Sequence, residues 1–471
     1  MNKTLEKNIG PLAAFLAFLS SFGFFQFAYP YHLIRREQQN LFLFDWDFIG
    51  QTYKGMGWLS RFAADFTDQF FHLPVAGPLI IALTLTGIGF FAYKIARQFL
   101  GKWFSLSIAA VVFVWSFFRE TGNIYCTQYT IVVLGYLALV LAALQFRKVW
   151  MKPVAAAVLL AVGVWALGSP LHKHYGKFWN KPSMEYERMI GIDAEVAREN
   201  WDKVIELSKV DLYMNEASYC YNLAQAMKGD LGNTIFNHSQ NLDEGLLIRF
   251  TSGLQFPNCL AGEAWFHIGN MTIAEQSAVI ALQASPKHTG SRFIERLAKI
   301  NLISGEYGSA QKYLSNLSKT LFYGKWAREM LACIQNDDMP DWVLKARANL
   351  VSTDHVYNNG YFRPILQELL DVNPNNTLAR DYLLCYDLLR YDLSAFVEDN
   401  REQPVPNDRI YQEALLIWFN RDGNHFTEEE AARYGISMSM MDKMQRFFRN
   451  PSLYKNTYWY QFMNALYDSN Q

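Results

Sequence analysis

Five uncharged apolar stretches lie within the first 170 residues, and they constrain the fold more than any other feature of the chain. A run of about 20 apolar residues is what a helix needs to cross about 30 Å of hydrocarbon. The shortest stretch is flanked by Lys102 and Arg119, whose long side chains can reach the membrane interfaces. We therefore predict five transmembrane helices, at about residues 11–29, 75–93, 103–118, 123–146 and 153–170.

Composition and charge support a membrane protein and exclude one class of partner. Of the 471 residues, 51% are apolar and only 18% are charged. Residues 1–177 carry 15 Lys and Arg against 7 Asp and Glu, so the remainder of the chain is net acidic. Nucleic-acid binding needs clustered basic residues, and we exclude it for this reason.

The distribution of Lys and Arg among the short connections predicts the topology. Basic residues gather before the first stretch and after the second and fourth, which places the N-terminus in the cytoplasm by the positive-inside rule. Five crossings then place the C-terminal part outside, in the periplasm of a bacterial inner-membrane protein. Two observations oppose this topology: Lys173, Lys177 and Lys181 follow the last stretch, and four unpaired cysteines would lie in an oxidising compartment.

The five cysteines are widely scattered, with no Cys-x-x-Cys pair. We therefore expect buried free thiols and neither a zinc site nor a disulfide framework. His172 and His174 could hold a metal only with a third ligand, which the neighbouring sequence does not offer, so we interpret them as part of an aromatic, basic anchor at the membrane. The sequence predicts no cofactor and no metal.

The outer loop, residues 34–74, contains the candidate catalytic residues Asp45 and Asp47, within "FLFDWDFIG". If residues 41–48 are extended, alternation places both carboxylates on one side and the aromatic residues on the other. Polytopic glycosyltransferases that use lipid-linked sugars resemble this arrangement, with an acidic base or metal ligand in the first outer loop. The alternative, which we favour, is an interfacial aromatic segment whose carboxylates face water. No further acidic cluster is evident in the outer loops.

The second half of this loop has the pattern of an amphipathic helix. Four apolar residues at helical spacing predict a helix lying flat at the membrane interface, with charged residues on its opposite side. The apolar residues are Leu59, Phe62, Phe66 and Phe70, and the charged ones are Arg61, Asp65 and Asp68.

From about residue 185 onward the sequence indicates paired helices. Small or turn-forming residues, Trp265 and a proline recur at intervals of 3, 4, 5, 7 and 5 within "GEAWFHIGNMTIAEQSAVIALQASP", as in a tetratricopeptide repeat. Gly262 and Ala274 would let two helices approach closely, and Gly269 would make the turn. A second copy follows, with its turn at Gly305 next to Tyr307.

Stacked helical hairpins bury a continuous core and leave a groove that commonly binds proteins. We predict a partner-binding groove lined by the repeats that contain Trp265, Gly269, Gly305 and Tyr307. The predicted domains are a transmembrane domain (1–170), an interfacial linker (171–184), a tetratricopeptide-like domain (185–400) and a C-terminal helical cap (401–471).

Nearly the whole chain resembles an uncharacterised family of bacterial polytopic membrane proteins. The resemblance rests on four passages, and it implies the architecture but transfers no catalytic residue. Where the family usually has a Pro-Gly-Gly step, this chain has Lys54-Gly55-Met56-Gly57. The passages are "GMGWLSRFAADFTDQFFHLPVAGPLI", "NLAQAMKGDLG", "INLISGEYGSAQKYLSNLSKTLFYGKWA" and "KNTYWYQF".

Three hypotheses follow. The first is a non-enzymatic envelope scaffold, anchored in the lipid bilayer, whose helical repeats bind a protein partner. The second is a membrane-embedded, glycosyltransferase-like enzyme that acts on a lipid-linked substrate through Asp45 or Asp47. The third is an accessory subunit of a transporter. The sequence contains no P-loop, dinucleotide fingerprint, nucleophile elbow or zincin motif, and so gives no support to those chemistries.

Overall fold

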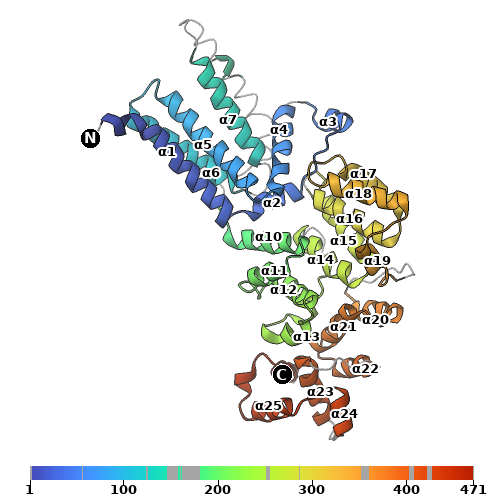
Figure 1. The fold of residues 1–471 in the computed structure, drawn as a ribbon. Coiled ribbons are helices and arrows are strands. Elements are labelled where there is room, and N and C mark those ends of the chain that lie inside the picture. Colours follow the sequence, from blue (N-terminus) through green and yellow to red (C-terminus); the bar gives the residue numbers. More distant parts are fainter. Residues whose placement is uncertain are drawn as a thin grey trace. The chain divides into compact units, whose positions relative to one another are not determined.

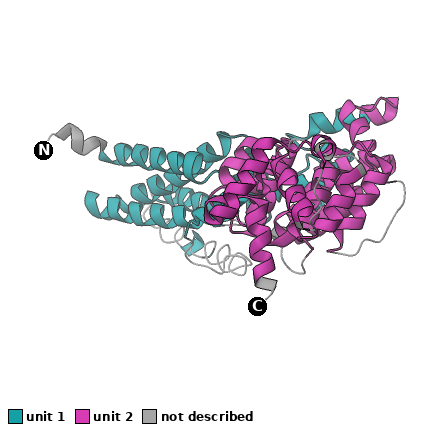
Figure 2. Cartoon of the chain, turned by 90° about the horizontal axis from the view of Figure 1, so that it is seen from below, with its two compact units in different colours: residues 1–190, 285–294, 314–331 teal, residues 191–284, 295–313, 332–471 magenta. Residues whose placement is uncertain are grey.

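The regular elements of this chain are helices, as predicted, throughout the part that the structure describes. The computed structural model divides into two compact units (Figure 2). Unit 1 comprises Met1–Ile190, Ser285–Ile294 and Leu314–Leu331, and unit 2 comprises Gly191–Ala284, Glu295–Tyr313 and Ala332–Gln471. The described residues are 3–55, 57–122, 126–145, 157–159, 161, 181–250, 255–285, 287–351, 360–402, 408–421 and 427–469.

Among its described residues, unit 1 contains three helices that are long and apolar enough to cross a membrane, over Ile9–Ala28, Ala76–Ala96 and Lys102–Glu120. They coincide with the first three predicted spans. The fourth predicted span holds a shorter apolar helix. Most of the fifth span, most of the 171–184 linker, and His172 and His174 lie outside the described residues. The helices of the N-terminal part are α1 (Lys3–Gly23), η1 (Phe24–Ala28), α2 (Tyr31–Gln38), α3 (Trp46–Thr52), α4 (Trp58–Asp68), η2 (Gln69–His72), α5 (Ala76–Ala96), α6 (Lys102–Glu120), α7 (Cys126–Ala143) and α10 (Met184–Ala197).

Helix α5 is the centre of this bundle, because α1, α6 and α7 all pack against it (Figure 1). Its buried residues include Ile81 and Leu85, which form one core cluster with Phe25, Tyr29 and other apolar side chains. Many apolar side chains on the other faces of α1, α5 and α6 remain exposed, among them Leu16, at 57%. A helix surrounded by hydrocarbon has this distribution of apolar residues.

The outer loop folds differently from the prediction. The extended segment ends at Asp45, because the Asp45 carboxylate accepts a hydrogen bond of 3.0 Å from the Phe48 backbone N–H and so begins helix α3. The predicted alternation over 41–48 is therefore wrong: Phe42 is buried, whereas Phe44 and Trp46 are exposed.

Unit 2 is built mainly from successive antiparallel helix pairs. Four of the described helices, α10 and α16 to α18, contribute residues to both units. The helices after residue 200 are α11 (Trp201–Ser208), α12 (Asn215–Met227), α13 (Leu231–Thr234), η3 (Ile235–Asn237), η4 (Leu242–Gly245), α14 (Gln255–Ile268), α15 (Met271–Ala284), α16 (Ser291–Ser304), α17 (Tyr307–Leu317), α18 (Gly324–Asn336), α19 (Asp341–Arg347), α20 (Phe362–Val372), α21 (Thr377–Leu389), α22 (Leu393–Glu402), α23 (Arg409–Arg421), α24 (Glu428–Arg433), α25 (Met438–Arg449), η5 (Pro451–Tyr454) and α26 (Tyr458–Ser469).

The α14–α15 hairpin shows why small residues recur in this unit. A Cβ atom added at Gly262 would lie 2.5 Å from the Ser277 Cβ atom, so only glycine permits this approach of the two helices. The Gly262 N–H also donates a hydrogen bond of 2.9 Å to the Ser277 hydroxyl. The predicted turn at Gly269 is present, with a φ of +116°. Cys220, Cys259 and Cys385 of this unit are buried free thiols, as expected, whereas Cys333 is a free thiol that is only partly buried.

Candidate functional site

The candidate catalytic residue Asp45 is used to hold the outer loop in place. Besides capping α3, its carboxylate accepts a hydrogen bond of 2.6 Å from the Lys319 ammonium group, and this bond lowers the pKa of Asp45. The backbone supports the same contact, since the Phe44 N–H donates to the Lys319 carbonyl. Asp47 lies in the first turn of α3 and is exposed.

A second set of charged residues, which the sequence did not reveal as a cluster, is buried where the outer loop meets the ends of α6 and α7. Arg36 of α2 donates hydrogen bonds to the Glu120 carboxylate and to the Thr127 hydroxyl. The Thr130 hydroxyl donates to the second oxygen of Glu120. Arg36 is 5% exposed and Glu120 is fully buried. We call Arg36, Glu120, Thr127, Thr130 and Asp68 the buried ionic cluster.

Helix α4 faces inward with the side that was expected to face water. Asp65 is 6% exposed, and its carboxylate accepts hydrogen bonds from Tyr53, Asn40 and Lys287. The prediction that the charged side of this helix faces water is therefore wrong for Asp65. Its carboxylate can be buried because Lys287, 222 residues later in the chain, supplies the compensating charge.

Asp68 is the carboxylate with the least compensation in the buried ionic cluster. Burial raises the pKa of Asp68 to about 7, although Arg36 and a hydrogen bond from Thr127 favour its charged form. Its Oδ1 atom is buried and has no hydrogen-bond partner among the described residues. A carboxyl group in such surroundings exchanges its proton near neutral pH.

This property predicts a pH dependence. Because the Asp68 carboxyl binds its proton more tightly in the folded protein, the stability that it contributes is complete below about pH 4 and is lost as the pH rises towards 7. Asp68→Asn removes this titration. We therefore expect the free energy of unfolding of the variant to fall less steeply with pH over this range, by at most about 1.4 kcal/mol per pH unit. Thermal unfolding in detergent at several pH values measures the slope, and Asp47→Asn, on an exposed side chain, is the control. An unchanged slope in Asp68→Asn would contradict the assignment.

The cluster does not have the composition of a metal centre. Within the described residues, no group of three or more His, Cys, Asp and Glu side chains is arranged to hold a metal ion. Arg36 occupies the space beside Glu120, and Lys287 does so beside Asp65. These cations neutralise the carboxylates and link the outer loop to the rest of unit 1.

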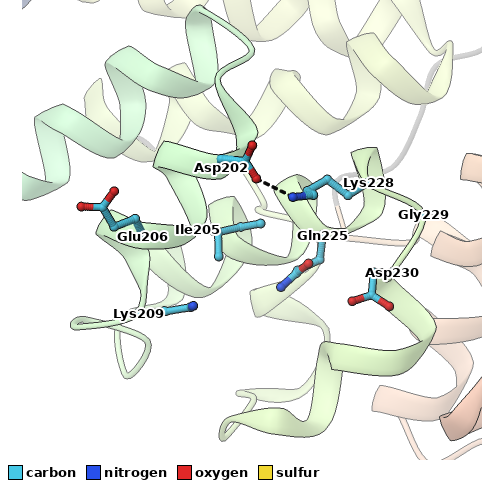
Figure 3. Close-up of a pocket in the computed structure, with 8 residues that line it drawn as sticks. All are labelled: Asp202, Ile205, Glu206, Lys209, Gln225, Lys228, Gly229 and Asp230. Atoms are coloured by element: carbon cyan, nitrogen blue, oxygen red, sulfur yellow. Dashed lines mark hydrogen bonds and ion pairs between the residues drawn. The ribbon is translucent and has the colours of Figure 1, made fainter.

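Unit 2 contains an open groove of about 640 Å³ on the hairpin of α11 and α12 (Figure 3). Ile205 provides apolar surface there, and the charged side chains around it are mostly exposed. The Lys228 ammonium group pairs with the Asp202 carboxylate across the two helices. The lining residues are Asp202, Ile205, Glu206, Lys209, Gln225, Lys228, Gly229 and Asp230, and we call this surface the α11–α12 groove.

The residues predicted to mark a partner-binding groove lie in later hairpins. Trp265 is fully buried in the core of unit 2, and Gly269 and Gly305 make the turns after α14 and α16. The Tyr307 hydroxyl accepts a hydrogen bond of 2.7 Å from Arg347, which fixes the start of α17. Partner binding by these repeats remains a prediction, because their observed roles are in packing and turns.

Comparisons with known proteins identify one match. The model of a family described as "Family of unknown function (DUF6057)" matches residues 6–174 and 171–465. No curated protein and no solved structure matches the chain.

Proposed function

Because this chain belongs to the family of unknown function DUF6057, its role must be argued from its own geometry, and we propose that it is a membrane-anchored scaffold that recruits a protein partner through unit 2. The observation that carries this proposal is the α11–α12 groove, which is open and lined by charges of both signs around Ile205. Such a surface suits a peptide segment with an apolar side chain flanked by charged ones.

Membrane anchoring is supported by the three long apolar helices and by their exposed apolar side chains. We extend this to five spans with a cytoplasmic N-terminus, which would place unit 2 outside a bacterial inner membrane. The repeat intervals around Gly269 and the close packing of α14 on α15 support a tetratricopeptide-like array. In such arrays the hairpins hold a recognition surface rigidly.

The enzyme alternative has less support from the geometry. A general base or metal ligand needs a carboxylate that is free to meet substrate, whereas Asp45 is bonded to Lys319 and to the start of α3. Asp47 is exposed on the same short helix. The scaffold proposal therefore requires that Asp45→Asn and Asp47→Asn retain partner binding.

Charge reversal in the groove tests the proposal. We expect the double variant Glu206→Lys/Lys209→Glu to lower the recovery of a stoichiometric partner about tenfold or more, because like charges would then face each other across the interface. The measurement is affinity purification from native membranes in mild detergent, with quantitative mass spectrometry of proteins and lipids. Lys455→Glu, on an exposed side chain of unit 2 outside the groove, is the matched control.

Two outcomes would overturn the proposal. One is a stoichiometric partner that the groove variant retains in full. The other is the absence of any protein partner together with a retained glycolipid, which would favour the enzyme alternative and direct attention to Asp45 and Asp47.

A further inference from the structure

A cavity of about 140 Å³ lies between α1, α5 and α6, which are all long and apolar enough to span a membrane. Its wall is almost entirely apolar, and small side chains from all three helices create the space. Those on α1 are Ala13, Ala14 and Ala17, that on α5 is Gly89, and those on α6 are Ala109 and Ala110.

The size and the wall of this cavity restrict what can occupy it. A helix is about 10 Å wide with its side chains and cannot enter so narrow a space. The wall offers water the Thr86 hydroxyl, which has no hydrogen-bond partner among the described residues, but little other polar surface, and a buried water needs about two to four polar partners. A segment of hydrocarbon chain matches the apolar wall, and it recovers the van der Waals contacts that an empty space would lose.

Basic residues at one end of the cavity add a second, independent indication. Phe90 lines the cavity, and the Lys94 ammonium group lies 5.4 Å from the centre of the Phe90 ring. Arg97 follows within one further helical turn, is exposed, and uses one of its five N–H donors on the Leu100 carbonyl. A phosphate headgroup beside Lys94 and Arg97 would have its acyl chain at the entrance to the cavity.

We propose that the cavity between α1, α5 and α6 binds one acyl chain of an anionic phospholipid, whose phosphate group pairs with Lys94 and Arg97. This site rests on the membrane anchoring proposed above and is independent of partner recruitment by the α11–α12 groove. Its effect is to fix one lipid in the bundle, because the chain contacts all three helices while the headgroup is held by the end of α5.

Native mass spectrometry of the full-length, delipidated protein tests the site. The probes are phosphatidylglycerol and phosphatidylcholine with identical acyl chains. We expect phosphatidylglycerol to bind about tenfold more tightly, and Lys94→Gln/Arg97→Gln to remove this preference while some binding of both lipids remains. Ala14→Leu/Ala110→Leu, which fills the cavity, should abolish binding of both lipids.

Gly135→Leu on α7 is the matched control, because a Cβ atom added there meets no atom within 4 Å. It should bind both lipids like the original protein. Equal affinity for the two lipids in the unaltered protein, or full binding by the cavity-filled variant, would overturn the proposal. Gel filtration and thermal unfolding identify a variant that fails to fold, and in that case the charge variant, whose changes lie on exposed side chains, decides the question.

The same samples separate this proposal from the proposed function. Extraction of native membranes with alkaline carbonate tests anchoring itself, and release of the chain would overturn both anchoring and the lipid site. Retention of the chain without a lipid preference would overturn the lipid site alone and leave partner recruitment unaffected.

Discussion

Arg36→Met is expected to lower the free energy of unfolding of unit 1 by about 3–5 kcal/mol. The substitution leaves the Glu120 carboxylate fully buried, with the Thr130 hydroxyl as its remaining side-chain donor among those described above. It also removes the hydrogen bonds that Arg36 donates to the backbone carbonyls of Glu120 and Gly122, which connect α2 to the end of α6. An uncompensated buried charge costs more than the pair itself contributes, so the loss is large even if the intact pair is nearly neutral in its net effect.

A double-mutant cycle separates the cost of leaving a buried charge unpaired from the contribution of the ion pair itself. Glu120→Gln alone should also destabilise the unit, whereas Arg36→Met/Glu120→Gln should recover much of the loss, because no unpaired charge remains. Denaturation in mixed detergent micelles gives the four free energies. Lys325→Met breaks an ion pair of 3.9 Å with Glu329 on the surface of the same unit, and it should cost less than about 1 kcal/mol. Additive losses in the cycle would show that Arg36 and Glu120 do not stabilise each other.

The buried ionic cluster also shows which features of this chain can be predicted from sequence. The length and apolar character of a candidate span are local properties, visible in about 20 consecutive residues, and for that reason the first three predicted stretches coincide with long apolar helices. Arg36 and Glu120 are 84 residues apart, and Asp65 and Lys287 are 222 apart. Pairing over such separations depends on the tertiary fold, so one sequence gives no signal for it.

Local chemistry can also mislead when a residue has two possible uses. The side chain of Asp45 would suit an extended, catalytic loop, but aspartate is equally a strong helix N-cap, and the structure uses it in the second way.

The turn glycines are the opposite case, because their role could be predicted from the sequence. A short turn between paired helices often contains a residue with positive φ, which glycine adopts most readily, although Glu199, Asp337 and Tyr391 also adopt it between helices of this chain. Gly269 and Gly305 were therefore predictable as turns, although the residues that pack against these turns were not.

Gly269→Ala is expected to destabilise unit 2 by about 2–5 kcal/mol. The first reason is conformational: Gly269 has a φ of +116°, a region that residues with a Cβ atom rarely adopt. The second reason is steric. A Cβ atom at this position would lie 2.6 Å from the Asn349 Cβ atom and 3.0 Å from the Asn349 carbonyl oxygen, and the backbone cannot move aside like a flexible side chain.

Gly305→Ala is the matched control for this prediction, because it changes a turn glycine without the steric conflict. Gly305 has a φ of +78°, and an added Cβ atom meets no atom within 4 Å, so the cost should be about 1–2 kcal/mol, which reflects the backbone conformation alone. Chemical denaturation of the full-length protein in detergent gives both values. If the two variants lose the same stability, the contact between the α14–α15 turn and Asn349 contributes nothing, and positive φ alone accounts for the glycine at position 269.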